Sequence, residues 1–159
     1  MQNLSSGDQD YNLWVLLGQA AQAAFKARER ELNQYGISAM QAAALFVIQA
    51  IGNQATPAKI SRWLFRESHT VSGLLDRMER EGLVKRVKDL DRKNLVRVVM
   101  TEKGQQAYGE STKGQSIHKL MSSLSEKERQ ELRSCLERLR NKALEGLAVN
   151  REPPPFPQF

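Results

Sequence analysis

Residues 57–104 read PAKISRWLFRESHTVSGLLDRMEREGLVKRVKDLDRKNLVRVVMTEKG, and the spacing of their apolar residues changes once. As far as Met78, the apolar residues recur at intervals of three or four, which is the period of a helix. Residues 84–87 and 95–100 are instead rich in valine and flank a polar, charged turn at 88–94, which predicts a two-stranded ribbon. The expected order is a short helix, a turn, an amphipathic helix and a β-ribbon.

Capping signals indicate where these helices begin and end. Thr56-Pro57 combines a capping hydroxyl with a proline at the first helical position, and Ser68 is expected to cap the amphipathic helix. Gly82 is expected to end that helix, because glycine readily takes the left-handed conformation found after helix ends.

Further helical patterns flank this stretch. A long first helix is expected to end near Gly36, and the capping box Ser38-x-x-Gln41 opens a second helix that ends at Gly52.

After the ribbon, one helix is expected at residues 101–122 and another from the capping box Ser125-x-x-Glu128 to about Leu147. The fold class that follows is mainly α with a small two-stranded β-wing. Residues 37–100 are expected to form a winged helix–turn–helix domain and residues 1–36 and 101–150 a helical dimerisation region. The Pro-rich residues 151–159 are expected to form an extended C-terminal arm.

The positive charge of the chain is concentrated in the same stretch. Between Lys59 and Arg97 there are eleven Lys/Arg against six Asp/Glu, a surplus of five in a chain whose net charge is +6. Such a concentration favours a polyanionic partner, because cationic side chains release the counterions condensed on nucleic acid. We therefore expect double-stranded DNA as the partner.

The amphipathic helix offers a polar face suited to reading base edges. Short polar side chains gather near its N-terminus, and Gly73 lets the backbone approach DNA closely. The DNA-binding candidates on this helix are Ser68, His69, Thr70, Ser72, Gly73 and Arg77. The alternative is an ordinary solvated helix face, which does not explain why a basic ribbon follows directly.

The ribbon turn places Arg92 and Lys93 on a projecting loop. A cation on a narrow protrusion can enter the minor groove, where the potential is most negative. Asp89 and Asp91 are expected to orient Arg92 through charge-assisted hydrogen bonds.

Residues 37–104 resemble the MarR family of bacterial transcription regulators. The resemblance is carried by TVSGLLDRMEREGLVKR, which is similar to the family's recognition helix and first wing strand, and by the DRK wing turn that ends in MTEKG. It implies a homodimeric regulator, usually a repressor, that binds a pseudo-palindromic operator. The stretch from Arg92 to Thr101 is one residue longer than the usual spacing, which a bulge or a longer wing tip could absorb. Whether Arg92 or Lys93 takes the groove-inserting role therefore stays open.

Family members dimerise through their terminal helices, and the last helix of this chain agrees with that arrangement. Its apolar stripe includes Leu132, Leu136 and Leu139. Stripes larger than a monomer can cover usually mark an interface, although packing between the first and last helices of one chain is the alternative. Cys135 beside the stripe is expected to be a buried apolar residue.

Family members also bind small aromatic effectors between the dimer helices and the DNA-binding lobe. Trp14, Met40 and Phe46 are the candidates for a site for a small apolar or aromatic effector. Residues of this kind more often belong to a core, and the sequence leaves both interpretations open.

Other functions find little support in the sequence. The chain has one cysteine and two distant histidines, no glycine-rich phosphate loop and no nucleophile–base set, so no metal, cofactor or enzymatic activity is expected. No apolar run is long enough for a membrane span and no secretory signal is evident, so a cytoplasmic protein is expected. The alternative function is a winged-helix protein-interaction module without specific DNA binding.

Overall fold

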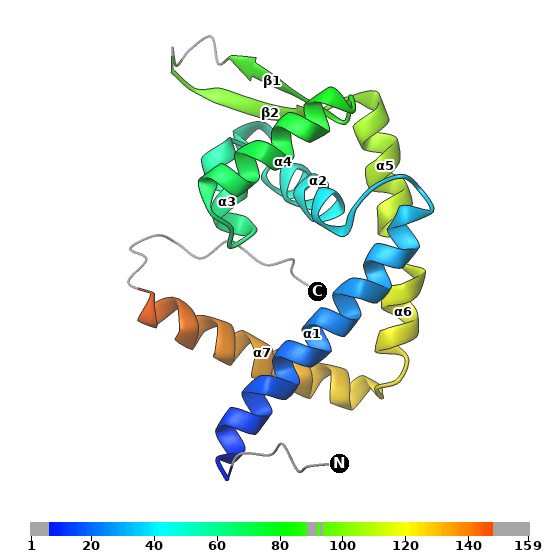
Figure 1. The fold of residues 1–159 in the computed structure, drawn as a ribbon, viewed down its shortest axis with the longest axis vertical. Helices are drawn as coiled ribbons and strands as arrows, with labels where there is room; N and C mark the ends of the chain where they lie inside the picture. The colour runs from blue at the N-terminus through cyan, green and yellow to red at the C-terminus, as the bar shows by residue number, and fades with distance from the viewer. Residues whose placement is uncertain (1–6, 89–91, 93, 148–159) are drawn as a thin grey trace.

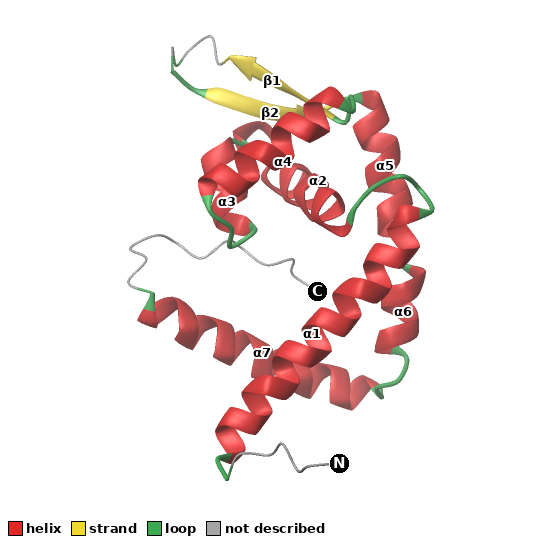
Figure 2. Ribbon diagram, in the orientation of Figure 1, coloured by secondary structure: helices red, strands yellow, loops and turns green. Residues whose placement is uncertain are grey.

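In the computed structural model, which describes residues 7–88, 92 and 94–147, a small ribbon and several helices form a lobe above three further helices (Figure 1). The elements are α1 (Gln9–Asn33), α2 (Ala39–Ile51), the short 3-10 helix η1 (Gly52–Gln54), α3 (Pro57–Trp63), α4 (Ser68–Arg80), β1 (Val84–Lys88), β2 (Val96–Met100), α5 (Glu102–Thr112), α6 (Gln115–Met121) and α7 (Glu126–Gly146). We call α2 to α5 with the ribbon the winged-helix lobe, and α1, α6 and α7 the helical region. The expected fold class, mainly α with a two-stranded wing, is confirmed (Figure 2).

Side-chain caps begin the helices at most of the expected positions. The hydroxyl of Thr56 accepts a hydrogen bond from the Lys59 amide of α3, and capping boxes are present at the starts of α2 and α7. The expectation for Ser68 is wrong. This residue is the first of α4, and Glu67 precedes the helix without a side-chain cap.

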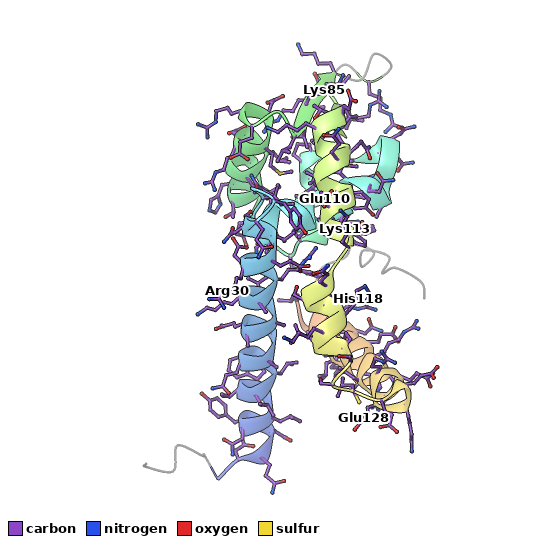
Figure 3. The ribbon with its side chains drawn as sticks, turned by 90° about the vertical axis from the view of Figure 1, so that its right-hand side faces the viewer. Arg30, Lys85, Glu110, Lys113, His118 and Glu128 are labelled. Atoms are coloured by element: carbon purple, nitrogen blue, oxygen red, sulfur yellow. The ribbon has the colours of Figure 1, made fainter. Side chains whose placement is uncertain are left out.

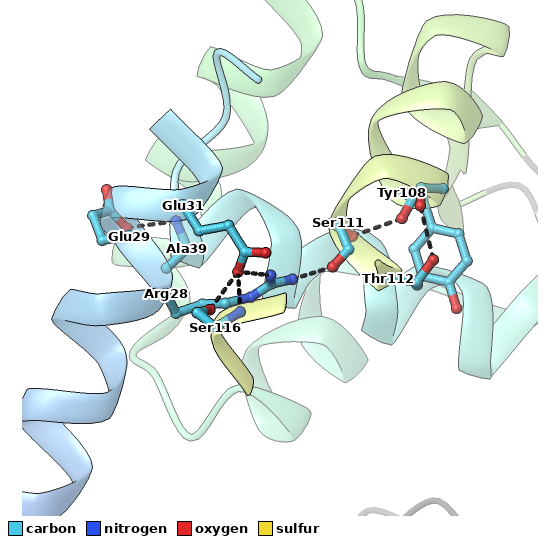
Figure 4. Close-up of polar contacts among 9 residues, drawn as sticks. Arg28, Glu29, Glu31, Ala39, Tyr108, Ser111, Thr112 and Ser116 are labelled. Atoms are coloured by element: carbon cyan, nitrogen blue, oxygen red, sulfur yellow. Dashed lines mark hydrogen bonds and ion pairs between the residues drawn. The ribbon is translucent and has the colours of Figure 1, made fainter. Parts of the chain in front are cut away.

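The single helix expected at residues 101–122 is also wrong, because Gly114 divides it into α5 and α6. Gly114 has a φ of 55°, in the left-handed region, so the helical hydrogen-bond pattern stops and restarts at Gln115. The corner is bonded to α1, where the Arg28 guanidinium donates to the Ser111 carbonyl and the Ser116 hydroxyl donates to the Glu31 carboxylate (Figure 4).

Glu31 lies almost buried at this corner, 2.9 Å from Arg28. Burial alone would raise its pKa, but the hydrogen bonds from Ser116 and Arg28 outweigh that effect and lower it. The carboxylate therefore stays charged and joins α1 to the start of α6.

The two strands of the wing pair one to one without a bulge. The antiparallel register runs from Val84 opposite Met100 to Lys88 opposite Val96. The extra residue noted in the sequence therefore belongs to the turn that joins the strands. The ribbon is anchored on the lobe, because the amide of Val98 donates to the carbonyl of Ala55 at 2.8 Å.

The apolar core lies within and directly below the winged-helix lobe. Its largest fully buried side chains come from α1, α2, α3, α4 and both strands: Leu32, Leu45, Ile60, Val71, Leu75, Met78, Val84 and Val98. Leu64 and Leu74 are partly buried against this core.

The helical region contributes only the C-terminal end of α1 to the core. Figure 3 shows α1 and α6 running beside each other below the lobe. No residue of α6 or α7 is buried, and Cys135 on α7 is exposed, contrary to expectation. The proposed C-terminal arm at 151–159 lies outside the described residues. Within the described part of the chain, none of the helices has the length and apolarity that a membrane span requires.

Gly104→Ala is expected to destabilise the lobe, because a Cβ at this position would lie 2.0 Å from the carbonyl oxygen of Leu83. A backbone oxygen cannot rotate away, so we expect a loss of about 2–4 kcal/mol in the free energy of unfolding, measured by denaturant titration. Gly109→Ala in the same helix is the matched control, since its Cβ would meet open space. That change should gain up to about 1 kcal/mol from helix propensity. Equal stability of the two variants would contradict the close approach of α5 to Leu83.

Candidate nucleic-acid interface

The polar face of α4 is exposed along its whole length. Three inward residues, Val71, Leu75 and Met78, fasten the helix to the core. All the candidate contact residues of the opposite face are exposed: Ser68, His69, Thr70, Ser72, Gly73 and Arg77. The sequence therefore separates the two faces of α4 cleanly, and the candidate contact residues on the polar one stay exposed.

The turn that leads into α4 contains a strained residue. Phe65 has a φ of 51°, which makes it the one non-glycine residue with positive φ among those described. Its amide donates to the Arg62 carbonyl and the amide of Arg66 donates to the Ser61 carbonyl, an arrangement that normally has glycine at the position of Phe65.

The same hydrogen-bond pattern ends α4, where the left-handed position is occupied by Gly82 as expected. At Phe65 the strain costs about 1–3 kcal/mol, and the ring stays 51% exposed instead of joining the core. The buried Ser61 hydroxyl steadies the turn by donating to the Arg66 carbonyl at 2.6 Å. Turn patterns in the sequence did not indicate the left-handed conformation of Phe65, because these patterns depend on a glycine at that position.

Arg86 of β1 ties the wing to α4. Its guanidinium lies 2.7 Å from a carboxylate oxygen of Asp76 and 2.7 Å from one of Glu79. Its amide also donates to Glu79 at 3.0 Å. In the sequence, Arg86 is one of the bases that make up the charge surplus, and the structure shows that it neutralises two acids on α4. The spacing of Asp76 and Glu79, three residues apart on one helix face, is the signal that could have revealed the pair.

The same contacts shift the pKa values of the partners. The backbone and side-chain hydrogen bonds from Arg86 lower the pKa of Glu79. Burial would lower the pKa of Arg86, but its hydrogen bonds to Glu79 and Asp76 outweigh that effect and raise it. Glu79 and Arg86 therefore stay charged near neutral pH, and their ion pair holds the wing against α4.

Arg92 lies exposed on the turn between the strands, where its carbonyl accepts a hydrogen bond from the Leu95 amide at 2.9 Å. Lys93, Asp89 and Asp91 lie outside the described residues. The choice between Arg92 and Lys93 as the cation that enters the groove therefore stays a prediction.

The three effector candidates do not meet in the single chain. Met40 and Phe46 lie six residues apart on α2 and so occupy different faces of that helix. Trp14 is 66% exposed on α1. It precedes Glu29, where α1 contacts the start of α2, by about 22 Å of helix.

The three candidate dimerisation residues share one helix and remain accessible. Leu132, Leu136 and Leu139 on α7 are 39–54% exposed in the single chain.

Comparison with known proteins supports the interpretation of this geometry. Residues 35–93, which include α2, α3, α4 and β1, match the model of the MarR family. The fold of the whole chain matches the crystal structure of the organohalide-sensing transcriptional regulator RdhR-CbdbA1625 in its 2,4-dichlorophenol-bound form, with a TM-score of 0.85 and 27% identity over 100% of this chain and 99% of that one.

The winged-helix part of the chain, residues 35–93, is therefore similar to the MarR family.

Two further MarR-type structures, solved with DNA, share the fold. A mutant form of MarR from E. coli, complexed with operator DNA, has a TM-score of 0.76 and 23% identity over 85% of this chain and 99% of that one. The S. aureus MepR–DNA complex has a TM-score of 0.68 and 24% identity over 86% of this chain and 96% of that one. None of the curated proteins compared with this chain matches it.

Proposed function

We propose that this chain is a MarR-family, sequence-specific DNA-binding repressor that acts as a homodimer on a pseudo-palindromic operator. The observation that carries the proposal is the exposed polar face of α4, flanked by the basic wing and fastened to it through Arg86. Each α4 would enter a major groove, with the residues from Ser68 to Arg77 against base edges. Each wing would reach the adjacent minor groove through Arg92 or Lys93.

The dimer is supported by the apolar surface of the helical region. Large apolar side chains on α1, α6 and α7 are 39–66% exposed: Leu13, Trp14, Leu16, Leu17, Phe25, Ile117, Leu120, Met121, Leu132, Leu136 and Leu139. A monomer rarely exposes so many apolar residues on neighbouring helices, because removing them from water is favourable. A second copy of the same helices is the partner that closed two-fold symmetry supplies.

Selection from random duplex DNA is expected to enrich a palindrome with half-sites about one helical turn apart, because each subunit offers one α4. Affinity should fall by roughly 10³ or more between low and moderate salt, since several phosphates are neutralised. Arg92→Ala should weaken binding by about 1–3 kcal/mol if this residue occupies the groove. Lys127→Ala, on the highly exposed start of α7, is the control and should leave affinity unchanged.

The same experiment separates the proposal from its alternative. Salt-insensitive binding without an enriched sequence would favour a winged-helix protein-interaction module. If both Arg92→Ala and Lys93→Ala bind like the wild type, the wing does not contribute to affinity.

Leu139→Glu is expected to dissociate the dimer, because it places a charge in the apolar surface of α7, where Leu139 is 54% exposed in the single chain. Sedimentation velocity at micromolar concentration should show a dimer for the wild type and a monomer for this variant. Leu139→Met keeps an apolar side chain of similar volume and should remain dimeric. A monomeric wild type at that concentration would refute the dimer.

We further propose that a small aromatic compound regulates operator binding. This proposal is supported by RdhR-CbdbA1625, which matches the whole length of this chain and was solved with 2,4-dichlorophenol. Because Trp14 is distant from Met40 and Phe46 in one chain, a site that uses all three requires the second subunit. An effector that prefers the DNA-free form tenfold changes the free energy of binding by about 1.4 kcal/mol per site.

2,4-Dichlorophenol is the probe for this regulation. It is expected to change the fluorescence of the wild type and to lower operator affinity, and Trp14→Phe should lose the fluorescence change while Trp63 remains as an internal reference. Phe46→Ala should bind the operator but lose the response. If a panel of phenols changes neither signal, regulation by such compounds is excluded.

A further inference from the structure

The N-terminus of α2 carries carboxylates from two other helices. From α1, a carboxylate oxygen of Glu29 accepts a hydrogen bond from the Ala39 amide at 2.6 Å (Figure 4). From the end of α4, a carboxylate oxygen of Glu81 accepts one from the Gln41 side-chain amide at 2.5 Å. The positive end of the α2 dipole favours both carboxylates. Three helices that are separate in sequence therefore meet at one helix terminus.

Gln41 connects the N-terminal cap of α2 to the C-terminal end of α4. Its side chain is almost fully buried, and it uses both ends of the amide. The oxygen accepts from the Ser38 amide at 2.9 Å, which closes the capping box of α2, while the nitrogen donates to Glu81. The side chain that closes the capping box of α2 therefore also contacts the end of α4.

The position of Glu81 is unfavourable for α4 itself. It is the C-cap of α4, where the negative end of the helix dipole disfavours a carboxylate. Contacts with other elements compensate: Gln41 donates to its side chain, and the Lys103 ammonium of α5 donates to its carbonyl at 2.8 Å. Glu81 therefore serves to attach the end of α4 to its neighbours.

We infer that Gln41 is a positioning residue for DNA binding, which sets the orientation of α4 relative to α2 and, through α2, to α1. The inference rests on the proposed function, because it concerns how α4 meets DNA. The 13 residues of α4 span about 20 Å, so a small tilt about its C-terminal end moves the N-terminal reading residues appreciably. In a dimer built on α1, this junction then determines the separation of the two recognition helices.

Gln41→Glu tests the junction without removing the α2 cap. A glutamate at this position still accepts from the Ser38 amide, but it no longer donates to Glu81 and repels it. We expect about tenfold weaker operator binding by the folded dimer, because a buried hydrogen bond is replaced by repulsion. We also expect a weaker preference among operators whose half-site spacing differs by one base pair, which a merely destabilising change would not alter.

The double variant Gln41→Glu/Glu81→Gln supplies the matched rescue. The amide introduced at position 81 can donate to the carboxylate introduced at position 41, so affinity and spacing preference should return to within about threefold of the wild type. Glu81→Gln alone keeps an acceptor for Gln41 and should behave like the wild type. If Gln41→Glu fails to fold, Glu81→Leu at the exposed partner removes the same bond and should show the same loss of spacing preference.

The outcomes of these binding measurements distinguish a failure of this inference from a failure of the proposed function. A wild-type spacing preference in Gln41→Glu or Glu81→Leu, or a double variant that folds without regaining it, overturns the inference and leaves the proposed function intact. A wild-type protein that binds no duplex DNA overturns the proposed function, and this inference with it.

Discussion

Among the described residues, the apolar core contains none from α6 or α7. This limit on the core separates a well-packed lobe from a helical region whose apolar side chains stay exposed. Burial of side chains from α2, α3, α4 and the ribbon holds the winged-helix lobe together around residues such as Leu45, Leu75 and Val98. The helical region extends away from this core with its apolar side chains exposed. The lobe can therefore present a polar face on α4, while the helical region keeps a large apolar surface exposed in the single chain.

Electrostatics determines how the lobe presents that face. Arg86 neutralises Asp76 and Glu79, so two acids on α4 are charge-compensated and the wing is oriented by the same contact. Two residues after Glu79, Glu81 joins Glu29 of α1 at the N-terminus of α2. Opposite charges and helix dipoles thus connect elements that the core alone would leave free to tilt.

Much of the fold was predictable from local patterns. The periods of apolar residues, the capping boxes and the terminating Gly82 correctly indicated α1 to α4, α7 and the ribbon. The exposed set on α4 was predictable for the same reason, since a helix with one apolar stripe must present its other faces to solvent. The errors arose where local signals compete. Ser68 is the first residue of α4 and not its cap, and Gly114 interrupts the helix that the apolar pattern predicted to run on to residue 122.

The order of polar and apolar residues along the chain was sufficient to predict the winged-helix fold class, because helix and strand periods depend only on neighbours in sequence. Three features required the tertiary structure. Arg86 of β1 pairs with two acids on α4, Gln41 bonds to Glu81 forty positions away, and Phe65 adopts a conformation that glycine normally occupies. The first two depend on distances between segments that no local period specifies, and Phe65 lies in a turn that carries no glycine signal.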